Sequence, residues 1–380
     1  MAVRGAMPVG RGGGQAGVMF VAWRDLRFAK GRFALMGTVI VLITLLVGLL
    51  SGLTAGLARE NVSAVTGLPA DRLAFAAPPP GREVSFTASA VPERAWRTWA
   101  ARPGVTAAEP VGISTLNAVA GGGERAAAVS VFGTRPSAGV APQSGRLGAG
   151  RAVLSRSAAD ELGVRPGDAV RLGARGRVTV AAVAGDASYS HTPVVWTSLD
   201  DWQGLGGPVE GTAATVVALR GGEGVDYAAG DRAAGTESRT VEEALEAMAS
   251  YQAENGSLQL MRGFLFVISA LVTGAFFTVW TIQRSGDIAV LKALGASTPY
   301  LLRDALGQAV VVLGTGTLLG TALAAGVGAL VSGDDVPFVL EPLTVLGPAA
   351  VMVVLGVLGA ALSIRRITAV DPLTALGSVR

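Results

Sequence analysis

The sequence predicts a membrane protein with four transmembrane helices and an α+β extracytoplasmic domain inserted between helix 1 and helix 2. Three observations predict this fold class. Apolar residues make up 50% of the 380 residues and charged residues only 16%, whereas about 25% of an ordinary soluble domain is charged. Four charge-free stretches are long enough to cross the hydrocarbon core of a bilayer, which is about 30 Å thick. Segment 58–262, between the first and second stretches, holds 40 charged residues and must therefore meet water.

The four charge-free stretches are the predicted spans. They are Phe33–Leu57, Gly263–Gln283, Ala305–Ser332 and Pro342–Ile364. A helix needs about 20 residues to cross the bilayer, and each stretch meets this length. The first is about twice as long as the apolar region of a signal peptide, so we expect it to be retained as a span.

The distribution of charge predicts the orientation of the spans. Segments 1–32, 284–304 and 365–380 together hold 12 basic and four acidic residues, whereas 58–262 holds 19 basic and 21 acidic residues. The short loop 333–341 holds three acidic residues and no basic one. Because basic residues concentrate on the cytoplasmic side, we expect both termini in the cytoplasm and 58–262 outside. Arginine supplies 29 of the 31 basic residues, and this bias, with 53 glycines, is typical of a GC-rich bacterial genome.

The predicted organisation is a multi-pass protein of the bacterial plasma membrane, divided as follows. Residues 1–32 form a cytoplasmic tail with an interfacial amphipathic helix, 33–57 form TM1, 58–262 the extracytoplasmic α+β domain with helical stalks, 263–283 TM2, 284–304 a cytoplasmic loop with a short helix, 305–332 TM3, 333–341 a short external loop, 342–364 TM4, and 365–380 a cytoplasmic tail. The interfacial helix is predicted at Val18–Arg32, where apolar and basic residues are interleaved.

The external segment reads as strands and short helices between two helical stalks. One stalk, Ala58–Val65, continues TM1, and the other, Thr240–Met261, runs into TM2 without a proline. Gly173–Arg177 reads as a hairpin turn. The predicted strands are Arg72–Phe75, Glu83–Ala88, Ala126–Phe132, Ala169–Leu172, Val178–Val183 and Pro193–Thr197, and the predicted helices are Pro92–Ala101 and Ser157–Leu162.

The cytoplasmic loop after TM2 contains a predicted helix, Ser285–Leu294, with apolar residues on one side. Gly295 is suited to the left-handed conformation that ends a helix. Ser297 or Thr298 then caps the next helix, with Pro299 in its first turn. A plain connector between two spans needs no ten-residue helix, so we expect this helix to dock on another protein.

Several function classes are excluded or disfavoured by composition. The absence of cysteine removes disulfides, zinc–thiolate sites and cysteine nucleophiles, and the single histidine, His191, removes a multi-histidine metal site. The only lysines, Lys30 and Lys292, do not follow glycine, so the chain cannot form a phosphate-binding P-loop. No catalytic constellation is evident, and we predict no enzyme activity in this chain. The pI near 9.7 is explained by a basic cytoplasmic rim facing anionic lipid, not by a nucleic-acid partner.

The predicted topology and three stretches of the sequence together resemble a known family. The topology, the stretch LKALGASTPYLL after TM2 and the closing DPLTALG (Asp371–Gly377) resemble the FtsX/MacB-type permeases of ABC transporters. The stretch GRAVLSRSAADELGVRPGDAVRL (Gly150–Leu172) is similar to the extracytoplasmic core of that family. The resemblance implies a homodimer of four-span subunits in the lipid membrane, with a separate cytosolic ATPase subunit that binds ATP, and no intrinsic cofactor. The cytoplasmic helix would then be the coupling helix, with these residues contacting the ATPase: Asp287, Ile288, Leu291, Lys292, Leu294, Gly295 and Ala296.

A finer resemblance points to the small haem-efflux (HrtB/DevC-like) branch of the family. It rests on WRDLRFAKGRFALMG, GLARENVSAVTGLPADRLAF and DASYSHTPVVWTSLDDW. Larger members of the family have a bigger external domain that meets an adaptor, and this chain departs from them. The branch implies haem as the candidate substrate.

Glu60 and Met261 are the candidate haem-contacting residues. Glu60 lies at the outer mouth of TM1, where an ionisable residue is a functional candidate, and its alternative role is a solvated carboxylate at a helix end. Met261, at the outer end of TM2, is a candidate soft ligand for haem iron, and its alternative role is packing. His191 is better explained as a surface or structural histidine than as a haem ligand. The sequence predicts no metal site.

Gly48, Gly52 and Gly56 are spaced four residues apart in TM1 and are predicted to form a close helix-packing seam. Glu60 follows at the same spacing, so it lies close to Gly56 in azimuth round the helix. A planar amphipathic molecule could enter a gap lined by such small residues.

Two functions remain open from the sequence. One is a permease subunit of an ABC efflux transporter that extrudes a hydrophobic or amphipathic substrate, with haem the candidate. The alternative is a mechanotransmission subunit that moves no substrate and relays ATPase motion to an envelope enzyme or sensor. The charge-free spans argue against a hydrophilic cargo crossing the middle of the membrane and fit either function.

Overall fold

The computed structural model describes residues 30–123, 125–206, 214–222, 224–283, 286, 290, 295, 297–331 and 338–368. They form two compact units, one made of Leu57–Ser257 and the other of the described parts of 1–56 and 258–380. The helix predicted at Val18–Arg32 lies outside the described residues apart from its last three positions, which begin a long helix. Most of the predicted cytoplasmic helix and of the loop 333–341 also lies outside them.

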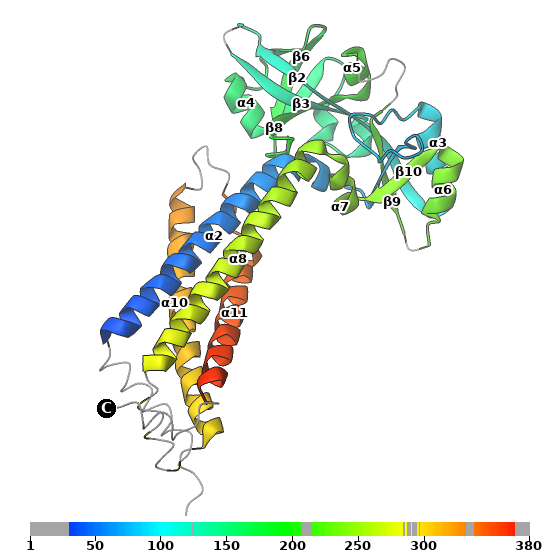
Figure 1. Cartoon of the computed structure of the whole chain (residues 1–380). Helices are drawn as coiled ribbons and strands as arrows, with labels where there is room; N and C mark the ends of the chain where they lie inside the picture. Colours follow the sequence, from blue (N-terminus) through cyan, green and yellow to red (C-terminus); the bar gives the residue numbers. More distant parts are fainter. Residues whose placement is uncertain are drawn as a thin grey trace, which may run out of the picture. The chain divides into compact units, whose positions relative to one another are not determined.

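The membrane unit contains four helices that are long and apolar enough to span a bilayer (Figure 1). They are α2 (Lys30–Thr66), α8 (Ala249–Gln283), α10 (Thr298–Val331) and α11 (Pro342–Thr368). The four predicted charge-free stretches fall within these helices, except for Ser332, which lies outside the described residues. Because the β-rich unit separates α2 from α8 along the chain, the predicted fold class is confirmed.

A small apolar core joins the four membrane helices. Met36 and Ile40 of α2 pack with Phe277 of α8, Leu313 of α10 and Ala360 of α11. Many leucines on the outer surfaces of the helices are exposed instead, up to 83% for Leu330. Apolar surface of this extent is suited to lipid or to another protein chain.

The other unit is built on ten strands, shown in cyan and green in Figure 1. The strands are β1 (Arg72–Ala76), β2 (Val105–Ala120), β3 (Ala126–Thr134), β4 (Arg151–Leu154), β5 (Ala169–Leu172), β6 (Gly176–Val183), β7 (Ser188–Tyr189), β8 (Thr192–Ser198), β9 (Val216–Gly221) and β10 (Thr236–Thr240). Their order is β10-β1-β9-β2-β3-β8-β4-β6-β5, and β7 pairs with β8.

Strand β2 belongs to two parts of this unit. Its first half, Val105–Val111, pairs with β9 in the open sheet β10-β1-β9-β2. Its last residues, Ala118–Ala120, pair with β5, so that β2, β3, β8, β4, β6 and β5 form a closed ring of strands. Closure removes exposed strand edges at this end of the unit. A strand of 16 residues is long enough to serve both parts.

Five short helices complete this unit: α3 (Glu93–Ala100), α4 (Arg156–Leu162), α5 (Leu199–Gly204), α6 (Tyr227–Ala234) and α7 (Val241–Ala244). Two fully buried tryptophans fix α3 and α5 on the strands. Trp99 lies against Gly230 of α6, and its indole donates a hydrogen bond to Thr236 Oγ1 at 3.0 Å. Trp202 lies over Gly112 and Gly133, which face each other across β2 and β3. Because each of these glycines lacks a Cβ atom, a tryptophan side chain can lie directly against its backbone.

A second core anchors the end of α2 in the same unit. Val62 and Val65 are buried with Phe75, Phe132 and further apolar residues of the sheet. The rings of Phe132 and Tyr189 lie 5.6 Å apart, edge to face. The predicted stalk Ala58–Val65 is therefore helical, and its last turns are packed into the β-rich unit.

Two predicted elements are wrong. Glu83–Ala88 is no strand, because only Phe86 is fully buried there and the segment follows three prolines and a glycine. The second stalk, predicted as one helix over Thr240–Met261, is interrupted. Helix α7 ends at Ala244, a 3₁₀ turn follows, and Met248 is extended (φ −93°, ψ 115°) before α8 begins at Ala249. Met248 is 2% exposed, so burial of its side chain in the core accounts for the break.

The other strands predicted for the β-rich unit, and its helices predicted at Pro92–Ala101 and Ser157–Leu162, are present within one or two residues at each end. Strands β2, β4, β7, β9 and β10 were not predicted. β2 contains Pro110 and Gly112, which weaken the alternating pattern that identifies a strand. β4 and β10 are only four and five residues long.

Candidate functional site

The predicted coupling residues cannot be placed as a group. Asp287, Ile288, Leu291, Lys292, Leu294 and Ala296 lie outside the described residues. Gly295 has a φ of +93°, in the region that favours glycine. Helix α10 starts at Thr298, with Pro299 in its first turn as predicted.

Two glycines of the predicted seam lie against other parts of the membrane unit. A Cβ atom on Gly48 would come within 2.8 Å of the Ala324 Cβ on α10, and one on Gly52 within 2.2 Å of the Phe338 ring. From the side of α10, a Cβ on Gly320 would approach Thr44 within 2.7 Å. These small residues therefore bring α2 and α10 of the same chain close together. Gly56 is buried.

Phe338 fills the outer end of this contact. Its ring lies against Gly52 of α2 and Gly328 of α10, and the neighbouring Val339 amide donates to the Gly52 carbonyl at 3.2 Å. Neither glycine could carry a side chain without moving the ring. The packing of Phe338 on these two glycines thus holds the segment that precedes α11 against α2 and α10.

Glu60 lies next to the only histidine of the chain. His191 Nε2 is 2.9 Å from both carboxylate oxygens of Glu254, and its Nδ1 is 3.9 Å from Glu60 Oε2. The three side chains are partly exposed, at 32% for His191, 40% for Glu254 and 47% for Glu60. All three belong to the β-rich unit: Glu60 comes from the last turns of α2 and Glu254 from the first turns of α8.

His191 lies in a strained two-residue turn between β7 and β8. Its φ is 59°, and that of Ser190 is 48°. Because Tyr189 pairs with Thr192, these two residues form the whole loop. A two-residue hairpin turn with positive φ at both positions is favoured by Asn-Gly. A residue with a side chain costs roughly 1–2 kcal/mol in that conformation, so neighbouring contacts must hold the turn in place.

Asn61 supplies several of those contacts. It is only 1% exposed and follows Glu60 on α2. Its Nδ2 donates to Glu254 Oε2 at 3.2 Å, and its Oδ1 accepts from Ser250 Oγ at 2.8 Å. Its backbone carbonyl accepts from the Ser190 amide at 2.9 Å. The Ser190 and Ser250 hydroxyls are also 2.9 Å apart.

We call these six residues the stalk cluster: Glu60, Asn61, Ser190, His191, Ser250 and Glu254. They join the end of α2, the start of α8 and the β7–β8 turn by side-chain and backbone hydrogen bonds. Each imidazole nitrogen faces a carboxylate: Nε2 faces Glu254 and Nδ1 faces Glu60. In the part of the chain that the structure describes, no group of three or more His, Asp or Glu side chains is arranged to hold a metal ion.

Met261 lies on an exposed surface of α8. It is 47% exposed, beside Leu260 at 61% and Phe264 at 59%. A thioether among exposed apolar side chains is available to a lipid, a second chain or a hydrophobic ligand. Met261 belongs to the membrane unit.

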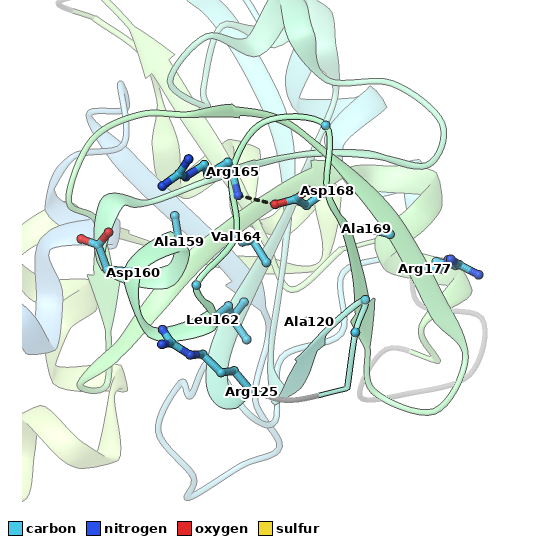
Figure 2. Close-up of a pocket in the computed structure, with 14 residues that line it drawn as sticks. Ala120, Arg125, Ala159, Asp160, Leu162, Val164, Arg165, Asp168, Ala169 and Arg177 are labelled. Atoms are coloured by element: carbon cyan, nitrogen blue, oxygen red, sulfur yellow. Dashed lines mark hydrogen bonds between the residues drawn. The ribbon is translucent and has the colours of Figure 1, made fainter.

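A groove of about 920 Å³ lies between the β2–β3 turn and the loop that follows α4 (Figure 2). Arg125, Arg165 and Arg177 line it together with Asp160 and Asp168. The Arg165 amide donates to Asp168 Oδ2 at 2.8 Å, and the Arg165 and Arg177 side chains point to opposite sides. The charged groups are exposed and do not converge, so the groove offers no assembled binding site.

Two family models match the chain. The MacB-like periplasmic core domain matches residues 34–234, more than half of the chain, and the FtsX-like permease C-terminal domain matches residues 260–372. The chain belongs to the MacB/FtsX-type family of ABC transporter permeases. The predicted family is therefore confirmed.

Relatives of this permease extend over nearly its whole length. It is 26% identical over 369 residues to the putative hemin transport system permease protein HrtB of Staphylococcus epidermidis, covering 94% of this chain and 99% of that protein. It is 27% identical over 378 residues to an uncharacterized ABC transporter permease of Mycobacterium tuberculosis, covering 95% and 99%. Among solved structures, it is similar to the periplasmic region of MacB from Actinobacillus actinomycetemcomitans, with 11% identity, a TM-score of 0.33 and coverage of 48% of this chain and 94% of that one.

The sequence of this permease points to Glu60 but not to its hydrogen-bonded neighbours. Glu254 is one of several glutamates in the predicted second stalk, and Asn61 belongs to no motif. Glu254 is 63 residues from His191 and 193 residues from Asn61 along the chain, so no local pattern joins them. The one available signal was the two-residue spacing between the strands that flank Ser190 and His191, which predicts a hairpin tip.

Proposed function

We propose that this permease is the membrane subunit of a bacterial ABC efflux transporter. A homodimer of the permease would work with a separate cytosolic ATPase that binds and hydrolyses ATP. The observation that best supports this assignment is the match of a permease domain and a periplasmic core domain over most of one chain. The two lysines of the chain do not follow glycine, which is consistent with ATP being bound by a partner.

The coupling role is assigned to the cytoplasmic loop between α8 and α10. Asp287, Ile288, Leu291, Lys292, Leu294, Gly295 and Ala296 would contact the ATPase. The positive φ of Gly295 and the start of α10 at Thr298 support a sharp corner under the membrane.

The coupling assignment is tested by co-purification. The permease and the ATPase are expressed together, and the complex is isolated through a tag on the permease. Deleting Ser285–Leu294 should abolish complex formation or coupled ATP hydrolysis, whereas Gly122→Ala, in the β2–β3 turn, should leave both unchanged. A complex that survives the deletion with coupled hydrolysis would show that the coupling assignment is wrong.

The proposed cargo is a hydrophobic or amphipathic molecule, with haem as the candidate. Haem is supported by the similarity to the HrtB relatives, which are named as putative hemin transport permeases, and the charge-free spans argue against a hydrophilic cargo. Glu60 would contact the cargo at the outer end of α2, because its carboxylate is half-exposed beside His191. Met261, exposed on α8, is the second candidate contact.

The cargo is tested with purified protein and with cells. Added haemin should produce a Soret band that is weakened in Glu60→Ala and unchanged in Glu83→Ala, which removes another exposed carboxylate of the same unit. A deletion strain should be sensitive to haemin and rescued only with an active ATPase. Normal haemin tolerance together with no spectral change would exclude haem and leave the permease assignment standing.

The second candidate function is force transmission without transport. The stalk cluster favours it, because hydrogen bonds from α2 and from α8 meet at one turn of the extracytoplasmic unit. Motion of the helices would then reach the strands directly and switch an envelope enzyme or sensor. A defect in division or wall hydrolysis in the deletion strain, with normal toxin tolerance, would support this function over efflux.

A further inference from the structure

The protonation state of His191 determines how many of the stalk helices it can hold. A neutral imidazole has one N–H, whereas the imidazolium has two. With the proton on Nε2, the neutral ring can donate only to Glu254, at 2.9 Å. The second proton would place an N–H on Nδ1, which faces Glu60 Oε2 at 3.9 Å.

Two carboxylates face the His191 ring, one from each stalk helix. Glu60 faces it from α2 and Glu254 from α8, and the turn that carries His191 adds no charge of its own. Arg59 neighbours Glu60 along α2 and is exposed. Tyr189, at the end of β7, is buried, and burial raises the pKa of its hydroxyl, so it remains neutral.

The β7–β8 turn is the part of the structure that a change in the protonation of His191 would affect. Ser190 and His191 adopt positive φ without being glycine, so the turn depends on outside contacts. Those contacts come from Asn61 and Ser250 on the two helices and from the His191 ring itself. Loss of one bridge therefore loosens a turn that is already strained.

We propose that His191 is a proton-operated latch whose imidazole bridges the β7–β8 turn to Glu60 of α2 and Glu254 of α8 when it is charged, and to Glu254 alone when it is neutral. Histidine exchanges this proton between about pH 5 and 8. The latch tightens as the pH around the extracytoplasmic unit falls and loosens as it rises. It would make the mobility of the stalks depend on the acidity outside the cell, whatever the cargo of the permease.

The test is hydrogen exchange of the full-length permease in nanodiscs at pH 5.5 and 7.5, corrected for the intrinsic pH dependence of exchange. The reporter is a peptide covering the Ser190 amide, which donates to the Asn61 carbonyl. In the unaltered protein, protection should be about 1.4- to five-fold higher at pH 5.5, the range expected for partly exposed ion pairs. In His191→Asn the ratio should be close to one, because asparagine tolerates the left-handed turn but does not titrate.

Two further variants keep the test decisive if His191→Asn disturbs folding. Glu60→Gln retains the turn and the imidazole but removes the carboxylate that Nδ1 faces, so the ratio should fall toward one. Glu93→Gln removes an exposed ion pair with Arg97 on α3, away from the turn, and should leave the ratio as in the unaltered protein. A ratio near one in the unaltered protein, or the same ratio in His191→Asn, would overturn the latch.

Discussion

At the scale of single residues, two glutamates of the β-rich unit respond to their surroundings in opposite ways. Glu243 accepts a hydrogen bond from the Thr240 amide in the capping box of α7, and this bond lowers the pKa of its carboxyl. Burial raises the pKa of Glu161 at the end of α4. The folded state therefore favours the ionised form of Glu243 and the neutral form of Glu161.

This difference predicts opposite effects of two matched substitutions. The stabilisation from Glu243 is present above the pKa of an unfolded glutamate, about 4.3, and is lost as the pH falls through the lower folded pKa. Glu161 instead weakens the fold as the pH rises through the same region. At pH 7, Glu243→Gln should lower the melting temperature and Glu161→Gln should raise it, each on the order of 1 °C.

Thermal unfolding at pH 7 and near pH 3.5 checks both substitutions. Near pH 3.5 both carboxyls are largely protonated in the unfolded chain, so the two differences should shrink. Shifts of the same sign at pH 7 would contradict the assigned causes.

At the scale of elements, the contact between α2 and α10 depends on glycines that leave no room for a side chain. A Cβ atom on Gly320 would lie 2.7 Å from both the Thr44 Cβ and the Val41 carbonyl oxygen, whereas one on Gly326 would meet nothing within 4 Å. Both glycines belong to α10, so replacement by alanine improves helix propensity equally, by about 1 kcal/mol.

Comparing alanine substitutions at Gly320 and Gly326 therefore separates the effect of helix packing from that of helix propensity. Gly320→Ala should destabilise the membrane unit by roughly 1–3 kcal/mol, because the backbone of α2 must move away. Gly326→Ala should be neutral or slightly stabilising. Thermal unfolding in one detergent, with both variants compared to the parent protein, measures this difference. Equal melting temperatures for the two variants would show that the α2–α10 contact is looser than its geometry indicates.

At the scale of the whole molecule, the charge distribution predicts the sides of the membrane. Segments 1–32, 284–304 and 365–380 are basic, whereas 58–262 is close to neutral. Charge asymmetry of this kind orients membrane proteins during insertion. The four apolar helices do not by themselves distinguish the two orientations.

The chain contains no cysteine, so single introduced cysteines can report orientation directly. Ala174→Cys, at the exposed turn between β5 and β6, should react with a membrane-impermeant maleimide in intact cells. Ser378→Cys, in the C-terminal tail, should react only after lysis. Labelling of Ser378→Cys in intact cells would show that the predicted orientation is wrong.

The candidate site was only partly predictable. Glu60 was identified because an ionisable side chain at the end of an apolar helix is conspicuous in the sequence. Its neighbours were not, since His191 and Glu254 approach it from a hairpin and from the start of α8. Such contacts arise from strand pairing and helix packing over long separations, which leave no local pattern.

The amino-acid sequence was sufficient to predict the four apolar helices, the strands on either side of Gly173–Arg177 and the membership of a permease family. Each depends on composition, on hydrophobic periodicity within a few residues, or on a contiguous stretch of residues. The folded structure was needed to show that β2 belongs to both the open part and the closed ring of strands, that Met248 interrupts the second stalk, and that Asn61 of α2 is buried and bonded to α8. These features depend on which distant segments bury their surfaces together, and burial is a property of the folded chain.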